Sequence, residues 1–282
     1  MAKKFIDRPI GRLYCLIRQA YYPNGFDLGR EATPLGGLCF FSPLIHYPHP
    51  ARNHERPTLR TYIYIDGFNL YYGAVKDTPY KWLDFMALFT KLLDPKHQIL
   101  RIKYFTAPVS GRDDPDQPVR QKTFIRALKT HIPEVRVYMG KFMVHNIWAH
   151  LAYPLDKRSL GKTINSAQIV KTEEKGSDVN LAVHLVNDAW RDVYDCAVVV
   201  SNDSDLAEAM RLVKAGHQKT IGLIYPLWKR PGLDPRHYRP NPSQQLQQYA
   251  DFTKRLRAGV LAAAQLPDPI PGTTISKPAA WL

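Results

Sequence analysis

Three acidic residues follow apolar runs, at positions where carboxylates could bind a metal ion. Asp66 ends the run at residues 62–65, and Asp203 and Asp205 follow the run at residues 198–200. Uninterrupted apolar runs of this length are typical of strands buried on both faces of a parallel sheet. Ligands of open parallel sheets bind beyond the carboxyl ends of the strands. The pattern therefore predicts that these acids lie at a binding edge.

Two of these acids also have a purely structural explanation. Asp66-Gly67 is a strong turn signal, and on that segment alone a turn is the favoured interpretation. Asp205 and Glu208 have the spacing of a capping box, which would make Asp205 a helix cap. The loop at residues 201–205 nevertheless holds two acids and three other polar side chains, more than one helix end requires. This excess favours a site.

A fourth acid, Asp178, begins a predicted helix over residues 177–191. Leu181 and Leu185 follow it at helical spacing and share its face, so that face should be the buried one. The helix dipole explains an acid at this end, but it does not explain why the acid faces inward. A carboxylate that faces inward needs a partner.

Together these four carboxylates indicate a divalent cation. Acids held within a few ångströms of one another repel strongly at low dielectric, and a hard cation relieves that repulsion. Ligands that are all oxygen suit Mg²⁺ or Mn²⁺, and the sequence has no Cys/His cluster that would favour zinc. Carboxylates that hold such ions recur where phosphate esters are cut.

Composition limits the classes of function. The chain has 282 residues, 45% of them hydrophobic, and a formal net charge of +14, which suits a polyanionic partner. No apolar run approaches the ~20 residues that span a bilayer, so no membrane partner is expected. Three cysteines, Cys15, Cys39 and Cys196, lack metal-ligand spacing. They favour free thiols in a reducing compartment and a cytoplasmic location.

The chain divides into three parts. Residues 1–59 are rich in proline and glycine and predict an irregular extension. Residues 60–226 alternate apolar runs with amphipathic segments, which predicts a three-layer α/β domain with a mainly parallel sheet. Residues 227–282 form a basic, proline-rich tail with one expected amphipathic helix near residues 243–261.

Periodicity places the individual elements of the central domain. Residues 145–160 interrupt the pattern and are expected to be an insertion or a long loop. The expected strands are residues 62–65, 99–105, 135–144, 196–200 and 220–225, and the expected helices are residues 81–93, 117–131, 177–191 and 204–215.

Three segments in this order resemble the motifs of the NYN domain, in the LabA-like branch of the PIN-like nuclease superfamily. They are IDGFN at residues 65–69, EEKGSDVNLAVHL at 173–185 and VVVSNDSDL at 198–206. The resemblance covers about residues 60–226. It implies a PIN-like, Rossmann-like α/β/α fold and a metal-dependent ribonuclease that hydrolyses RNA phosphodiester bonds with a metal-activated water.

The resemblance also implies roles for particular residues. Asp66, Asp178 and Asp203 would be the principal ligands of Mg²⁺ or Mn²⁺. Asp205 would be a further ligand or would orient the water. Hydrogen-bonding roles would fall to Asn69 and Ser201. The positions that match the family as catalytic are Asp66, Asn69, Asp178, Asp203 and Asp205.

Basic residues suggest how RNA would bind. Lys171 and Lys175 flank the approach to Asp178 and would contact phosphates, although solvated lysines are the common alternative. The run of basic and aromatic residues at 230–239 suits single-stranded RNA, and equally a disordered basic linker. Asn202 departs from the resemblance, because such loops often have glycine there.

Two other classes of function stay open. A non-catalytic RNA- or protein-binding module would keep the fold, although such a module would tolerate loss of the four acids. A phosphatase of small phosphoesters would want a second aspartate two residues after Asp66, where Phe68 stands. The RNA target, the mode of cleavage and the oligomeric state also stay open, with a homodimer among the possibilities.

Overall fold

The computed structural model describes residues 58–112, 114–157, 162–226 and 242–281. The expected irregular extension falls almost wholly in residues 1–57, and the basic aromatic run falls in residues 227–241. Both therefore lie outside the described residues. Everything below concerns the unit that runs from His54 to Leu282.

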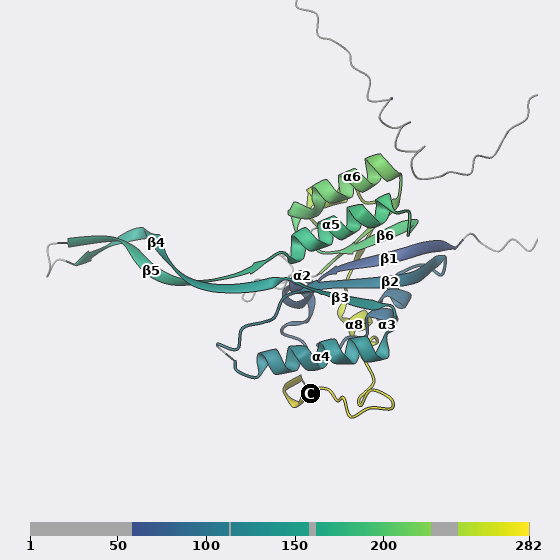
Figure 1. Cartoon of the computed structure of the whole chain (residues 1–282), viewed down its shortest axis with the longest axis horizontal. Coiled ribbons are helices and arrows are strands. Elements are labelled where there is room, and N and C mark those ends of the chain that lie inside the picture. The colour runs from purple at the N-terminus through teal and green to yellow at the C-terminus, as the bar shows by residue number, and fades with distance from the viewer. Residues whose placement is uncertain (1–57, 113, 158–161, 227–241, 282) are drawn as a thin grey trace, which may run out of the picture. The chain divides into compact units, whose positions relative to one another are not determined.

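Within the described residues, six strands form one parallel sheet in the order β3-β2-β1-β6-β7-β8 (Figure 1). The chain builds one half of the sheet outward from β1 and then returns to build the other half from β6. The switch point of the topology therefore lies between β1 and β6, where open α/β sheets bind their ligands. The strands are β1 (Leu59–Asp66), β2 (His97–Thr106), β3 (Val135–Met139), β6 (Cys196–Val200), β7 (Thr220–Tyr225) and β8 (Phe252–Arg255).

Helices cover both faces of this sheet and make three layers (Figure 1). Successive residues of β1 point to opposite faces: Ile63 and Ile65 pack with α3 and α4, while Tyr64 packs with α5 and α6. This is why the apolar run has no polar alternation. The helices are α3 (Phe85–Leu92), α4 (Gln117–His131), α5 (Ser177–Trp190) and α6 (Ala207–His217).

The predicted three-layer α/β fold with a mainly parallel sheet is confirmed. The ranges predicted for α4, β6 and β7 coincide with the observed elements, and α5 ends one residue earlier than predicted. The helix expected at residues 81–93 is shorter, because Asp84 caps α3 by accepting a hydrogen bond from the Ala87 amide.

Residues 145–160 were expected to be an insertion or a long loop, and the long loop is wrong. Residues 141–157 and 162–175 form β4 (Lys141–Lys157) and β5 (Lys162–Lys175), an antiparallel hairpin that makes its own two-stranded sheet. The third strand expected at residues 135–144 is therefore divided between β3 and β4. Large apolar side chains are exposed along the hairpin, among them Trp148 at 72%. None of the hairpin side chains that the structure describes is fully buried, and apolar residues stand on both faces, so the sequence lacks the clear apolar–polar alternation that identifies a strand.

The prediction of a single helix near residues 243–261 is also wrong. That segment forms α7 (Gln244–Gln247), then strand β8, then α8 (Ala258–Ala262). Apolar residues at near-helical spacing instead enter the core from separate short elements, with Leu246 on one side of the sheet and Leu261 on the other.

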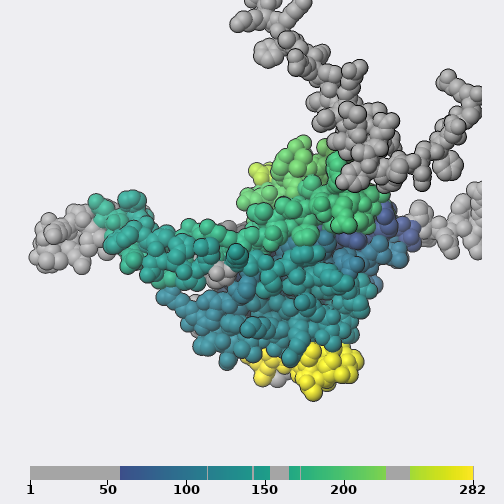
Figure 2. Space-filling model, viewed as in Figure 1, coloured from purple at the N-terminus to yellow at the C-terminus, as the bar shows by residue number. Residues whose placement is uncertain are grey.

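The C-terminal segment continues past α8 and packs beside α4, where it lies in yellow in Figure 2. Trp281, in the short 3₁₀-helix η4 (Ala279–Trp281), contacts the rings of Phe124 and Trp82 at centroid distances of 6.0 and 6.4 Å. The segment that the sequence placed in a tail therefore contributes both a sheet strand and part of the apolar core.

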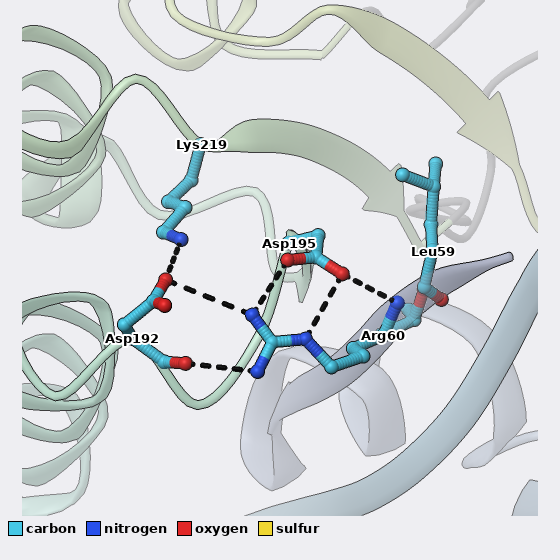
Figure 3. A network of polar contacts seen from close by, with 6 residues as sticks. Leu59, Arg60, Asp192, Asp195 and Lys219 are labelled. Carbon is cyan, nitrogen blue, oxygen red and sulfur yellow. Dashed lines mark hydrogen bonds and ion pairs between the residues drawn. The ribbon is translucent and has the colours of Figure 1, made fainter. Parts of the chain in front are cut away.

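An ion-pair network fixes the start of β1 to the turn before β6 (Figure 3). The Arg60 guanidinium donates to Asp195 through Nε (3.0 Å) and through its terminal nitrogen (2.7 Å), and to the Asp192 carbonyl (3.0 Å). Lys219 pairs with Asp192. The fork geometry of arginine gives this contact its direction, and the guanidinium lowers the pKa of the Asp195 carboxyl. The network aligns β1 with β6. The opposite ends of these two strands lead to Asp66 and Asp203.

No helix in the described part of the chain is long and apolar enough to cross a bilayer.

Candidate active site

The carboxylate of Asp66 lies at the switch point, at the end of β1, and is 3% exposed. It caps the short helix α2 (Gly67–Leu70), because its Oδ1 accepts a hydrogen bond from the Asn69 amide at 2.9 Å. Its Oδ2 accepts from the Ser201 hydroxyl at 2.8 Å. Two donors from two different loops thus fix the orientation of this carboxylate.

A glycine is required directly after Asp66. A Cβ atom on Gly67 would lie 2.7 Å from the Phe105 carbonyl oxygen and 2.8 Å from the Tyr104 ring. Only a residue without a side chain lets α2 begin this close to β2. The Asp-Gly pair therefore forms the turn that the sequence predicts, and it also places the Asp66 carboxylate in the wall of a pocket.

The loop after β6 is joined to the loop after β1 by side chains of both. The Asn69 amide oxygen accepts from the Asn202 backbone at 3.1 Å, and the Ser201 hydroxyl oxygen accepts from the Asp203 backbone at 3.1 Å. Asp203 then caps the following 3₁₀ turn by accepting from the Asp205 amide at 3.0 Å. The cap of this helix is thus Asp203, not Asp205.

Asp178 reaches the site from the first turn of α5. Gly176 precedes the helix with a φ of 96°, a left-handed conformation that favours glycine. Glu174, at the end of β5, accepts from the Ser177 amide at 3.0 Å. Asp178 shares its helix face with the buried Leu181 and Leu185, as the sequence predicts.

These parts enclose a pocket of about 270 Å³. Carboxylates from three regions of the chain line it, together with one amide and two aromatic rings. The lining residues are Asp66, Phe68, Asn69, Tyr72, Glu174, Asp178 and Asp203.

The acids in this pocket disturb one another's ionisation. Burial, followed by the charges of Asp66, Asp203, Glu174 and Asp205, raises the pKa of Asp178 to about 7. Burial also raises the pKa of Asp66, while the hydrogen bonds from Asn69 and Ser201 lower it in part. Strongly shifted carboxylates in a concave site are typical of functional centres.

Replacing Asp178 by Asn is expected to stabilise the protein at neutral pH in EDTA. The pKa of Asp178 is about 7 in the folded chain, against an ordinary value of 3.8. Between these two pH values the folded chain therefore keeps a proton on the Asp178 carboxyl. The unfolded chain has released it, so the free energy of unfolding falls as pH rises through this window. Asn cannot ionise, so the variant does not lose this free energy of unfolding. The expected difference is about 1–2 kcal/mol, after allowing for solvent screening of a half-buried group.

Urea unfolding at pH 5 and pH 8 measures this difference. The stability of Asp178→Asn relative to the parent should be greater at pH 8, and added Mn²⁺ should narrow the gap by stabilising the parent. A relative stability that is equal at both pH values would contradict the assignment.

The donor set suits a hard cation. Among the described residues, no three His, Cys, Asp or Glu side chains converge closely enough to hold a metal ion directly as they stand. Mg²⁺, however, keeps several of its waters and is bound through one or two carboxylates. Asp66 and Asp203, linked through Ser201, and Asp178 across the pocket fit that mode of binding. The Ser177 hydroxyl, one residue before Asp178, is buried and has no hydrogen-bond partner among the described residues.

The remaining predicted residues lie around the pocket rather than in its wall. Ser201 is fully buried behind Asp66, and Asp205 is exposed on the loop, where its charge still acts on Asp178. Lys171 and Lys175 lie on β5, and both pair with Glu173. Neither lysine lines the pocket.

Sequence reasoning missed three wall residues: Glu174, Phe68 and Tyr72. Glu174 stands four residues before Asp178, within a motif that was recognised, so its spacing was the available signal. Phe68 and Tyr72 are four apart, which places them on one face of a helical turn. Their rings lie nearly parallel, with centroids 6.3 Å apart.

A parallel sheet with acids at its switch point defines a Rossmann-like α/β protein with an acidic pocket at that point. Comparison with known families then identifies the class: the NYN domain matches residues 60–253. The chain belongs to the NYN domain family. This family falls in a nuclease-like superfamily.

Two other proteins are similar to this chain, one in sequence and one in structure. The chain is 32% identical over 252 residues to the Pseudomonas putida (strain DSM 28022 / S16) protein named 6-hydroxy-3-succinoylpyridine 3-monooxygenase HspA, covering 82% of this chain and 78% of that one. A solved structure of a Vibrio parahaemolyticus RIMD 2210633 protein of unknown function, VPA0982, aligns with a TM-score of 0.43 and 17% identity. That alignment covers 75% of this chain and 98% of the other.

Proposed function

We propose that this protein is a metal-dependent ribonuclease of the LabA-like branch, which hydrolyses RNA phosphodiester bonds with Mg²⁺ or Mn²⁺. The observation that carries the proposal is the pocket at the switch point. There, carboxylates from β1, from the β6 loop and from α5 face one another without a cation from the described residues in the pocket wall. A nuclease of this chemistry needs such a concentration of negative charge to hold its ion.

When bound, the divalent cation supplies orientation of the phosphate, activation of the attacking water and stabilisation of the leaving oxygen. The chain supplies the geometry. The Ser201 hydroxyl donates to the Asp66 carboxylate and accepts from the Asp203 backbone amide, so it sets these two residues side by side. Asp178 lines the same pocket from α5. Asn69 fixes the two loops against each other. Asp205, exposed beside the pocket, is the group we assign to orienting the water.

The RNA would approach from the side that carries the hairpin. Lys171 and Lys175, on β5, lie on the strand that leads into the site and would contact phosphates. Each is paired with Glu173, so their contribution is expected to be smaller than that of free lysines. We infer a single-stranded substrate, because the bases must be accessible to the aromatic residues at the pocket wall.

The deciding experiment incubates full-length protein with a pool of 5′-labelled single-stranded RNAs. Three conditions are compared: Mn²⁺, Mg²⁺ and EDTA. Cleavage that requires the cation supports the proposal. RNA binding without cleavage in any condition would instead favour a non-catalytic binding module on the same fold.

A second candidate comes from the Pseudomonas putida relative, whose name describes monooxygenation of a hydroxylated pyridine. The match at 32% identity over most of both chains favours testing that chemistry here. Protein, 6-hydroxy-3-succinoylpyridine, O₂ and NADH are incubated together, and loss of the pyridine is followed by chromatography. Substrate loss without RNA cleavage would replace the nuclease proposal.

A further inference from the structure

A second and larger cavity, of about 380 Å³, adjoins the acidic pocket. The two share Phe68 and Tyr72, whose rings line both. Protein interiors are close-packed and hold few voids larger than a water molecule. A cavity of this volume falls instead in the range of small-molecule sites.

The wall of this cavity is aromatic and comes from distant parts of the chain. Its rings belong to the segment after β1, to α3, β2 and α4, and to the C-terminal end. They are Tyr71, Tyr72, Phe85, Tyr104, Phe124 and Trp281. Most of them meet one another tilted or edge-on, such as Phe85 with Phe124 at 90° and Phe124 with Trp281 at 71°. Such a wall suits a flat aromatic ligand.

The backbone along one wall of the cavity has an unusual conformation. Residues Tyr71–Val75 form a π-helical turn, in which the Lys76 amide donates to the Tyr71 carbonyl at 2.8 Å. Single π turns are frequent at functional sites. Here the turn brings Tyr71, Tyr72 and Val75 to the cavity wall.

Charge at the cavity favours an anionic ligand. Three cations, Lys76, Lys81 and Arg120, line it against two acids, Asp77 and Asp114. Asp114 pairs with Arg120 and leaves part of the guanidinium fork for another partner. Aromatic rings would hold the flat part of the ligand, and the surplus positive charge would hold an acidic group on it.

We propose that this cavity binds a planar heteroaromatic ring that carries an anionic group. The shared wall of Phe68 and Tyr72 places the ring beside the carboxylates of the acidic pocket. Two sources provide this chemistry: the base of a nucleotide within RNA, or a free heteroaromatic acid. The proposal does not depend on RNA cleavage.

The test is isothermal titration calorimetry of the full-length protein in EDTA, where metal-dependent cleavage cannot occur. The probes are the four nucleoside 5′-monophosphates and 6-hydroxynicotinate, a free heteroaromatic acid. At least one probe should bind saturably. Binding of nucleotides alone assigns the cavity to an RNA base, binding of 6-hydroxynicotinate alone assigns it to a free acid, and binding of both supports the shared chemistry.

Variants separate the cavity from the rest of the surface. Ala280→Trp places a large side chain at an exposed position of the cavity wall and should weaken binding at least tenfold, as should Tyr72→Ala. Trp190→Ala, a control at a 69% exposed tryptophan on α5 that lines neither pocket, should leave it unchanged. No saturable binding of any probe, or binding that survives both cavity variants, overturns the proposal.

Discussion

Asp203→Asn and Asp66→Asn are each expected to lower the rate of metal-dependent RNA cleavage by at least about 100-fold. Asn keeps the shape of the side chain but removes the charge that would attract the cation. Asp66→Asn retains an oxygen that can accept from the Asn69 amide, and the Ser201 hydroxyl can accept from the new amide nitrogen. The fold should therefore survive, which circular dichroism and the unfolding midpoint will establish.

A matched control is available in Asp116→Asn. Asp116 is an exposed acid just before α4 whose side chain makes no capping hydrogen bond. Its cleavage rate should equal that of the parent. If one of the two active-site variants cuts RNA at the parental rate, the residue changed in that variant does not hold the catalytic ion.

Asp188→Ala is expected to destabilise the protein by about 3–5 kcal/mol, because it leaves a buried lysine without its counter-ion. Asp188 Oδ2 accepts from Lys103 Nζ at 2.5 Å and from the Tyr64 hydroxyl at 2.6 Å. The lysine and aspartate side chains are 8% and 6% exposed. The pair fixes α5, the helix that carries Asp178, to the centre of the sheet.

The double variant Lys103→Met/Asp188→Leu separates the ion pair from simple packing. Replacing a buried pair by apolar residues of similar size is often neutral or stabilising, so the double variant should recover most of the loss. Urea unfolding measures both variants. If the double variant is as unstable as Asp188→Ala, the network stabilises the protein through the Tyr64 hydroxyl or through its shape, not by pairing the charge.

The fold was predictable from the sequence where strands are buried on both faces. The strands β1, β6 and β7 read as unbroken apolar runs, because helices cover both sides of them. The hairpin escaped prediction because none of its described side chains is fully buried and apolar residues such as Ile147 and Trp148 stand on both faces, so the sequence shows no clear apolar–polar alternation. The C-terminal strand escaped because β8 is only four residues long and takes its place by pairing with β7.

The acids of the site were predictable for a related reason. A carboxylate directly after a buried strand stands out against its neighbours, as Asp66 does. Asp178 could be placed facing inward from the spacing of Leu181 and Leu185. For Glu174 the only signal was its spacing of four residues before Asp178, because the strand that carries it, β5, belongs to a hairpin that the sequence did not reveal. Phe68 and Tyr72 read as ordinary apolar residues until two cavities are found to share them.

Binding of Mn²⁺ to the acidic pocket tests the central claim most directly. Free Mn²⁺ is followed by electron paramagnetic resonance while full-length protein is added, for the parent, for Asp66→Asn/Asp178→Asn and for the control Asp116→Asn. The account predicts saturable binding to the parent and to the control, and loss of that site in the double variant. Equal stoichiometry and affinity in all three proteins would show that these carboxylates do not hold the ion.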